Sequence, residues 1–325
     1  MLDIITIGDI KLDTFVQIND ASVQCEVRMP ECKLCLDYGA KVAVDKVESQ
    51  MAGSAPNVAV GLSRLGHKTA VLSNMGTDGT RALSLERLTE EKVDSSLVFA
   101  NKDAQSSYSV VLNYQGDRTI LTSHIKHEYR LPKRLPKTDW LYVSEIGDGY
   151  EDLYSDIVAY KKNHDVKIGC NPGSIQIQER KSELLALLKI TDIIFINLEE
   201  AQQITQSSSK APHTLMSELS KIGVKTVILT DGKRGAFAYE NKKLYAVPIF
   251  PGKAVETTGA GDAFATGYLG AILAKKPLED ALKWGAVNSS SVVGHIGPQP
   301  GLLRKTQMLK HLREAPTTFV VEEIS

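Results

Sequence analysis

Residues 255–267 read VETTGAGDAFATG, a glycine-rich turn followed by an acidic residue and a run of small or apolar side chains. The apolar run continues to Ala274 and predicts a buried helix whose first turn is the glycine turn. A helix N-terminus exposes unpaired N–H groups and the positive end of the helix dipole. Glycines placed before it let an anionic group approach the backbone closely.

Asp262 therefore stands beside a potential anion site. That pairing suits phosphoryl transfer, in which amides stabilise the moving charge and a carboxylate takes the proton of the attacking hydroxyl. A tight connection whose aspartate only complements the helix dipole has the same pattern. Other phosphate motifs fit poorly: GAGDAF lacks the last glycine of G-x-G-x-x-G, and no G-x-x-x-x-G-K-[ST] loop or protein-kinase catalytic loop occurs.

The 325 residues suffice for one large α/β domain or two smaller ones. Lys and Arg number 38 against 39 Asp and Glu, which argues against a nucleic-acid or anionic-membrane partner. No apolar run reaches the length of a membrane span, and the N-terminus, with Asp3 and no basic region, is unlike a signal peptide. We expect a soluble, cytoplasmic protein with neither nucleic acid nor membrane as partner.

The cysteines are Cys25, Cys32, Cys35 and Cys170. Cys32 and Cys35 form a C-x-x-C, which is typical of half a zinc site or of a redox pair. Cys25 would supply a third zinc ligand, but no second C-x-x-C or histidine pair completes the set. In a cytosolic protein we expect reduced thiols.

Strand and helix patterns alternate along most of the chain, beginning with a strand at residues 4–8. Further strands are expected at 69–73, 139–146, 166–170, 192–196 and 224–229, and helices at 58–65, 82–88, 153–160, 182–188, from 197, and at 278–293. This alternation favours a doubly wound, mostly parallel sheet with helices on both faces. Polar residues follow the strands, at the edge where such folds bind ligands: Asp13, Asn171, Asn197, Glu200, Thr230 and Gly232. For Asp13, the local pattern favours a simple turn residue.

Two β-only segments interrupt the alternation. One has strand patterns at 14–18 and 40–45, and the other, at 106–123, predicts a hairpin with its turn at Gly116. We expect a lid made of residues 12–48 and 104–125, inserted in a single domain of residues 1–325. A dimerisation surface is the compatible alternative.

The segment 52–66 reads AGSAPNVAVGLSRLG, in which Val58, Leu62 and Leu65 have helical spacing and Gly66 is a C-terminal stop. Asn57 falls in the first turn, where its amide could meet a ligand near the glycine turn or cap the helix.

Taken together, these motifs resemble the ribokinase-like (pfkB) carbohydrate kinase family nearly from end to end. ETTGAGDAFATG is similar to the family's C-terminal signature and GSAPNVAVGLSRLG to its N-terminal one. Residues 197–200 (NLEE) resemble its N-x-x-E element, 230–235 (TDGKRG) its nucleotide-ribose turn, and 116–121 (GDRTIL) its lid hairpin.

The resemblance implies ATP-dependent phosphorylation of a hydroxyl on a sugar or sugar-like alcohol. Asp262 would be the general base, and the amides of Gly259, Ala260 and Gly261 would form the anion hole. The substrate would be held by Asp13 and Asn57, with Gly53 allowing close backbone approach. At a helix N-terminus the pKa of Asp262 should be low, which is tolerable because its main task is to orient the nucleophile.

The same resemblance implies residues for nucleotide and metal. Asn197 and Glu200 would help to place Mg²⁺ through water, and Thr230, Gly232 and Gly235 belong to the nucleotide turn. The loop from Asn288 to Gly297 would border the adenine. The lid implies a homodimer, since it often serves in dimerisation in this family.

The chain also departs from the family pattern. Ala52 replaces the first glycine of a pair, and Glu256 stands where the family has Asp, near a site where many members bind a monovalent cation such as K⁺. Lys11 replaces an amide of ribokinases proper, and Ser54-Ala55-Pro56 lacks their Gly-Lys-Gly. Ribose is therefore not the favoured substrate, and Lys11 either binds an anionic substituent or is simply solvated. A nucleoside kinase is the alternative function. A non-catalytic sugar-binding relative is also considered, but the intact GAGD argues against it.

Overall fold

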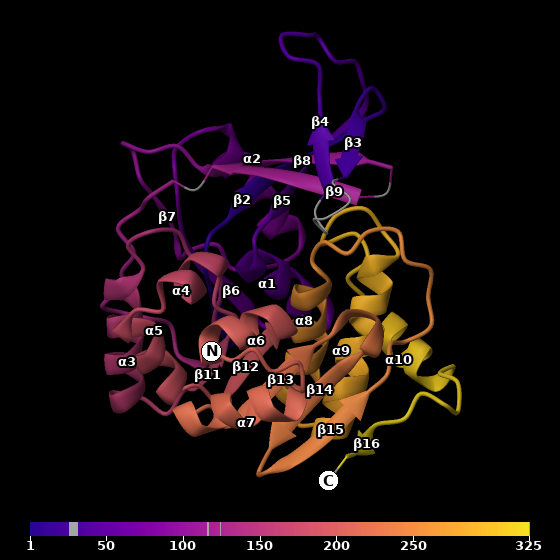
Figure 1. Ribbon diagram of the computed structural model, residues 1–325. Coiled ribbons are helices and arrows are strands. Elements are labelled where there is room, and N and C mark those ends of the chain that lie inside the picture. Colours follow the sequence, from indigo (N-terminus) through magenta and orange to yellow (C-terminus); the bar gives the residue numbers. More distant parts are fainter. Residues whose placement is uncertain (26–31, 116, 124, 325) are drawn as a thin grey trace.

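The computed structural model describes residues 1–25, 32–115, 117–123 and 125–324, and a large sheet flanked by helices dominates it (Figure 1). The strands of this sheet are β1 Leu2–Ile7, β6 Thr69–Met75, β7 Val98–Ala100, β10 Thr138–Val143, β11 Lys167–Cys170, β12 Ile193–Asn197, β13 Thr226–Thr230, β14 Ala236–Glu240, β15 Lys243–Val247 and β16 Glu322–Glu323. They lie in the order β16-β15-β14-β13-β12-β11-β10-β1-β6-β7.

The sheet is parallel from β7 through β13, and β14, β15 and β16 add antiparallel strands at one edge. This confirms the expected mostly parallel sheet. From β1 the chain first moves to β6 on one side, and later returns to place β10 on the other side of β1. The strand order therefore reverses between β1 and β10. In open α/β sheets such a reversal opens a crevice at the carboxyl ends of the strands.

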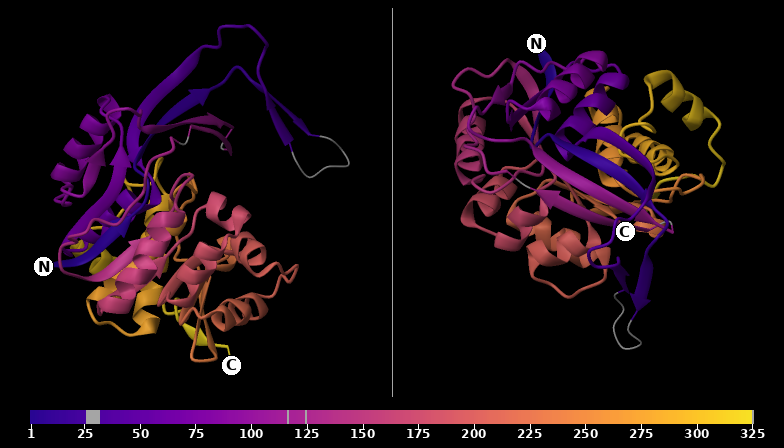
Figure 2. Two further views of the ribbon diagram at one scale, coloured as in Figure 1. Left: turned by 90° about the vertical axis from the view of Figure 1, so that its left-hand side faces the viewer. Right: turned by 90° about the horizontal axis from the view of Figure 1, so that it is seen from above.

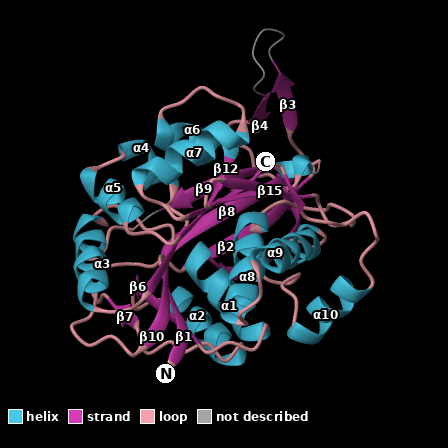
Figure 3. Cartoon of the chain, turned by 90° about the horizontal axis from the view of Figure 1, so that it is seen from below, coloured by secondary structure: helices cyan, strands magenta, loops and turns pink. Residues whose placement is uncertain are grey.

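Helices cover both faces of the sheet, as expected (Figure 3). Their bounds are α1 Ser54–Arg64, α2 Gly79–Glu90, α3 Glu151–Asn163, α4 Ser174–Glu179, α5 Ser182–Lys189, α6 Leu198–Thr205, α7 Pro212–Ile222, α8 Ala260–Leu273, α9 Leu278–Val293 and α10 Lys305–Arg313. Successive strand residues point to opposite faces. Ile4 thus belongs to the core cluster that holds side chains of α1, α8 and α9, whereas Ile5 belongs to the cluster that holds side chains of α3, α5 and α7.

A separate small sheet stands over the carboxyl edge. Its strands are β2 Lys11–Ile18, β5 Val44–Ala52, β8 Ser107–Tyr114 and β9 Asp117–Ser123, in the order β5-β2-β8-β9. β8 and β9 form the expected antiparallel pair, although the expected turn residue Gly116 lies outside the described residues. The strand expected at 40–45 was placed wrongly. The limits of this strand, β5, are set by its pairing with β2, which runs from Ile18↔Val44 to Lys11↔Ala52.

A hairpin of β3 Ser22–Cys25 and β4 Cys32–Cys35 projects from the small sheet, away from the helices (Figure 2). Cys25 faces Cys32 across the pair and forms a disulfide with it. The expectation of reduced thiols is therefore wrong for these two, while Cys35 and Cys170 are free. Among the described residues, no helix combines the length and apolar character needed to cross a bilayer.

Candidate active site

The reversal of strand order brings together residues that follow β1 and β10. Lys11 Nζ lies 3.1 Å from Glu145 Oε2, and the amide of Asp9 donates to the Glu145 carbonyl at 3.0 Å. Neither Asp9 nor Glu145 was among the predicted site residues. The strand expected at 139–146 contained Glu145, whereas β10 ends at Val143 and leaves Glu145 in the segment beyond it.

Asp9 is a buried anchor beneath this cluster. Its Oδ1 accepts from the Tyr129 hydroxyl at 2.7 Å and its Oδ2 from the Gly147 amide at 2.9 Å. Burial raises the pKa of Asp9 to about 7. Gly53 has φ +114°, and a Cβ added there would lie 2.2 Å from the Asp9 carbonyl oxygen. A glycine is thus required at position 53, because the backbone of Asp9 lies too close for a side chain there.

Lys11 and Asp13 lie in β2, so Asp13 is a strand residue rather than a turn residue. Burial lowers the pKa of Lys11, but the carboxylates of Glu145 and Asp13 outweigh this and hold it above its ordinary value. Burial also raises the pKa of Asp13. Asp13 Oδ1 is buried without a hydrogen-bond partner among the described residues, so it is an acceptor still available to a ligand hydroxyl.

Asp262 lies in the first turn of α8, next to Asn57 of α1. Gly259, before the helix, has φ +76°, and a Cβ there would lie 2.5 Å from Pro298 Cβ, so a glycine is needed. Asn57 Nδ2 donates to Asp262 Oδ2 at 2.8 Å. The expected low pKa of Asp262 is wrong. Burial raises this pKa, and the hydrogen bond from Asn57 offsets only part of that effect.

A pocket of about 340 Å³ adjoins the first turn of α8. Thr230, Gly232 and Gly235 line it together with Ala260 and Gly261. Its other walls are largely apolar and include Ile249, Phe250, Phe264, Ala286 and Val293. The predicted nucleotide turn and the predicted anion hole therefore share one cavity.

Asn288 does not line this pocket. Its side chain is fully buried, with Nδ2 donating to the Ala263 carbonyl at 2.8 Å and Oδ1 accepting from the Leu303 amide at 3.0 Å. Both ends of the amide therefore hold α9 in place, and the expectation that the segment from Asn288 to Gly297 borders the adenine stays a prediction. Ser289 and Ser290 of the same helix line the pocket instead.

Asn197 and Glu200 form a capping box at the start of α6. Asn197 Oδ1 accepts from the Glu200 amide and Glu200 Oε2 from the Asn197 amide, both at 2.9 Å. Burial raises the pKa of Glu200, and the charge of Asp262 adds to this effect. Within the described residues no cluster of three or more His, Cys, Asp or Glu could hold a metal.

The small sheet touches the loop that leads into α8. Arg118 Nη1 of β9 donates to Thr257 Oγ1 at 2.8 Å. In the same loop Glu256 Oε1 accepts from the Thr258 hydroxyl at 2.5 Å, and Glu256 Oε2 accepts from the Gly297 amide at 2.8 Å. These contacts fix the loop on both sides of Thr257.

The sequence pattern of the pfkB family carbohydrate kinases matches residues 19–305. The chain belongs to this family. It is therefore an enzyme, a phosphotransferase of the sugar and nucleoside kinase type. A ribokinase of Haemophilus influenzae is 27% identical over 282 residues, which cover 81% of this chain and 87% of that protein.

Two solved structures show the same fold. The nucleoside kinase of Methanocaldococcus jannaschii, an archaeal member of the ribokinase family, has a TM-score of 0.77 at 21% identity and covers 97% of this chain and 99% of its own. Ribokinase of Arabidopsis thaliana, complexed with ribose and ATP, has a TM-score of 0.79 at 19% identity, with 96% of this chain and 99% of its own covered. This pfkB kinase therefore has the ribokinase fold.

Proposed function

We propose that this kinase transfers the γ-phosphoryl group of ATP to a hydroxyl of a sugar or sugar-like alcohol, with Asp262 as the base. One observation carries the proposal. Asp262 follows Gly261, which lines the pocket, and its carboxylate accepts a hydrogen bond from Asn57, one of the predicted substrate-binding residues. A base in this position would adjoin both the donor phosphate and the acceptor hydroxyl.

In the proposed reaction the acceptor hydroxyl gives its proton to the Asp262 carboxylate and its oxygen bonds to the γ-phosphorus. The bond from that phosphorus to the β–γ bridging oxygen breaks, and ADP leaves. The raised pKa of Asp262 makes it a better proton acceptor than an exposed aspartate. The amides of Gly259, Ala260 and Gly261 would stabilise the charge of the transferred group, since the first amides of a helix have no acceptor within it.

Thr230, Gly232 and Gly235 would contact the nucleotide, whose adenine suits the apolar walls of the pocket. Mg²⁺ typically binds one or two carboxylates together with substrate phosphates, and it would supply charge neutralisation. Glu200, with Asn197 beside it, is the candidate side chain for holding that ion. A site completed by phosphates agrees with the lack of a closed protein cluster among the described residues.

The acceptor side favours an uncharged polyol. Asp13 offers an unpaired acceptor for a hydroxyl, and Lys11 is already neutralised by Glu145 at 3.1 Å. A second anion near Lys11 would also meet the carboxylates of Asp13 and Asp262. We therefore prefer a neutral substrate to the anionic one that Lys11 alone suggested. A nucleoside is the second candidate, favoured by the structural likeness to the nucleoside kinase.

The small sheet is proposed to act as a lid, latched by Arg118 on Thr257, and to join two copies of the chain. Ile120 and Leu121 are consecutive in β9, so they point to opposite faces, and both are about half exposed. One apolar face can cover the acceptor while the other meets a second copy. Light scattering of the purified protein should give a dimer mass.

The test of the acceptor is a competition. Neutral pentoses and hexoses, their phosphates, sugar acids and nucleosides are offered to the enzyme with Mg·ATP, and phosphorylated products are identified by mass spectrometry. A neutral sugar or polyol should give the highest kcat/KM. A preference for nucleosides would select the second candidate, and a preference for phosphates or acids would refute the assigned role of Lys11.

A further inference from the structure

We propose that Gln299 is a positioning residue that orients the amide of Asn57 toward Asp262. Gln299 lies in the loop between α9 and α10, and its side chain is buried. It touches neither Asp262 nor the nucleotide pocket. This inference deepens the proposed function and rests on the role of Asp262 in it.

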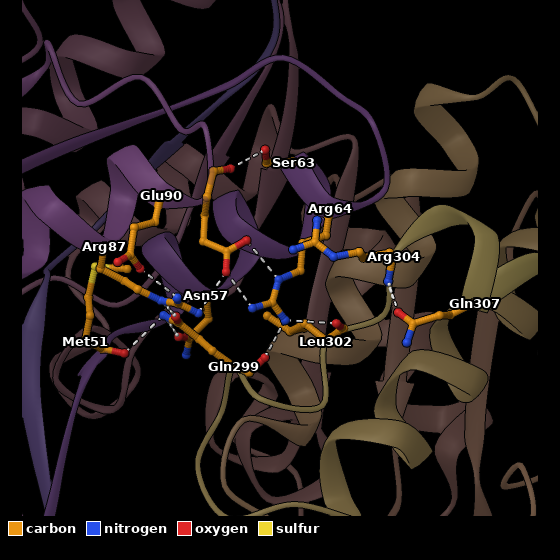
Figure 4. Close-up of polar contacts among 11 residues, drawn as sticks. Met51, Asn57, Ser63, Arg64, Arg87, Glu90, Gln299, Leu302, Arg304 and Gln307 are labelled. Atoms are coloured by element: carbon orange, nitrogen blue, oxygen red, sulfur yellow. Dashed lines mark hydrogen bonds and ion pairs between the residues drawn. The ribbon is translucent and has the colours of Figure 1, made fainter.

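The amide of Asn57 has two ends of nearly equal shape but opposite polarity. Its Nδ2 donates to Asp262 Oδ2 at 2.8 Å. If the amide turned over, its oxygen would face the carboxylate, and two acceptors would oppose each other. The neighbour on the other side of Asn57 decides between these arrangements, and that neighbour is Gln299, whose Nε2 donates to Asn57 Oδ1 at 3.1 Å (Figure 4).

The orientation of the Gln299 amide is set by two partners, one of which can only donate a hydrogen bond and the other only accept one. Arg87 can only donate, and its Nε donates to Gln299 Oε1 at 3.3 Å. The Met51 carbonyl can only accept, and it accepts from Gln299 Nε2 at 3.0 Å. The direction of every hydrogen bond from Arg87 to Asp262 is therefore set.

Ion pairs hold Arg87, the first residue in this series of hydrogen bonds. Arg87 pairs with Glu91 at 2.8 Å, and Glu91 also pairs with Arg64 at 2.6 Å. Arg64 Nη1 in turn donates to the Gln299 carbonyl at 2.8 Å, so the same network holds both the backbone and the side chain of Gln299. Such a network can transmit orientation to the base without contact with substrate.

Two substitutions separate orientation from simple packing. Gln299→Met keeps the volume and removes both polar ends. Gln299→Glu keeps an acceptor for Arg87 but cannot donate to Asn57, and its carboxylate would attract Asn57 Nδ2 away from Asp262. Both variants also lose the hydrogen bond to the Met51 carbonyl, so a purely structural role would lower stability without changing the pH profile of kcat, whereas an orienting role changes both kcat and that profile.

The control is Ser291→Ala. The Ser291 hydroxyl donates to the Gly301 carbonyl at 2.7 Å and so anchors the same loop without touching Asn57. We expect both Gln299 variants to lower kcat about tenfold, the scale of one lost hydrogen bond, with the KM for ATP unchanged. The acid limb of the kcat profile should move to higher pH, because Asn57 would no longer stabilise the Asp262 carboxylate. Ser291→Ala should change neither kcat nor the pH at which the acid limb of its profile lies.

The decisive readout combines these variants with Asn57→Ala. If Gln299 acts through Asn57, adding Gln299→Met to Asn57→Ala should cause no further loss of kcat, and thermal unfolding should show every variant folded. Wild-type kcat in Gln299→Glu, or multiplying losses in the double variant, would overturn the inference. Full activity of Asp262→Asn would instead overturn the proposed function.

Discussion

Asn57 donates a 2.8 Å hydrogen bond to the carboxylate of Asp262, although 205 positions of sequence separate the two residues. The bond joins the first turn of α1 to the first turn of α8, and these helices pack against each other on one face of the sheet. The two signature motifs of the chain are therefore brought together in one candidate site, which is complete only when the sheet and its helices have formed.

The two glycines of the nucleotide turn should respond differently to substitution. A Cβ at Gly235 would lie 2.2 Å from the Val247 carbonyl oxygen at φ +86°, whereas at Gly232, with φ +50°, it would meet nothing within 4 Å and would add only the strain of a left-handed backbone. Gly235→Ala should therefore weaken ATP binding and lower the melting temperature by several degrees, and Gly232→Ala should cost less. Titration calorimetry with ATP and thermal unfolding would measure both. Equal losses in the two variants would contradict this account of the turn.

Removing the latch of the small sheet should weaken acceptor binding. Without the bond from Arg118 to Thr257, Arg118→Ala should raise the KM for the acceptor roughly three- to tenfold and leave the KM for ATP almost unchanged. Steady-state kinetics against each substrate would show this. Arg134→Ala, on the exposed loop before β10, makes the same charge change and serves as control. An equal effect of both variants would reject the latch.

Asp9 should make part of the stability depend on pH. Its pKa is about 7 in the folded protein and 3.8 as an ordinary aspartate, so between these values the folded state binds more protons than the unfolded chain. The stability that Asp9 contributes is full below about pH 4 and declines as the pH rises toward 7. The melting temperature of the wild type relative to Asp9→Asn should therefore be higher at pH 5 than at pH 8.

Thermal unfolding of both proteins at the two pH values checks this expectation. Asp139→Asn makes the same chemical change at an exposed position on β10 and is the control. A difference between wild type and Asp9→Asn that stays constant with pH would show that Asp9 keeps an ordinary pKa.

Activity should not depend on K⁺. Both carboxylate oxygens of Glu256 are already bonded, one to the Thr258 hydroxyl and one to the Gly297 amide, so this side chain itself ties the loop before α8 to the loop after α9. Replacing K⁺ by Na⁺ should leave kcat nearly unchanged. The shorter side chain in Glu256→Asp cannot reach both the Thr258 hydroxyl and the Gly297 amide, so this variant should have a lower kcat in Na⁺. Activation of the wild type by K⁺ over Na⁺ would disprove this role.

The sequence predicted what depends on local pattern. Periodicity located most helices and strands, and the helix expected at 278–293 is α9. A glycine turn before an apolar run placed Asp262 in a first helical turn. The helix α7 was missed although Pro212 at its start was an available signal.

What the sequence could not supply depends on contacts across the chain. The limits of β5 follow from its ladder with β2, and the pairing of Cys25 with Cys32 follows from the β3–β4 register. The helix dipole predicted a low pKa for Asp262, but burial by other segments raises it. No local sequence pattern points to the role of Gln299, because its partners Met51 and Asn57 lie 248 and 242 positions away in the chain.

The most direct measurement is ADP release with Mg·ATP and the best acceptor, in the wild type and in Asp262→Asn. We expect Asp262→Asn to lose about 10²–10⁴ of kcat while still binding ATP, because only proton transfer and nucleophile orientation are removed. Its melting temperature near neutral pH should rise, since a partly buried charge is replaced by a neutral amide. Wild-type turnover in Asp262→Asn would contradict the assignment of Asp262 as the base.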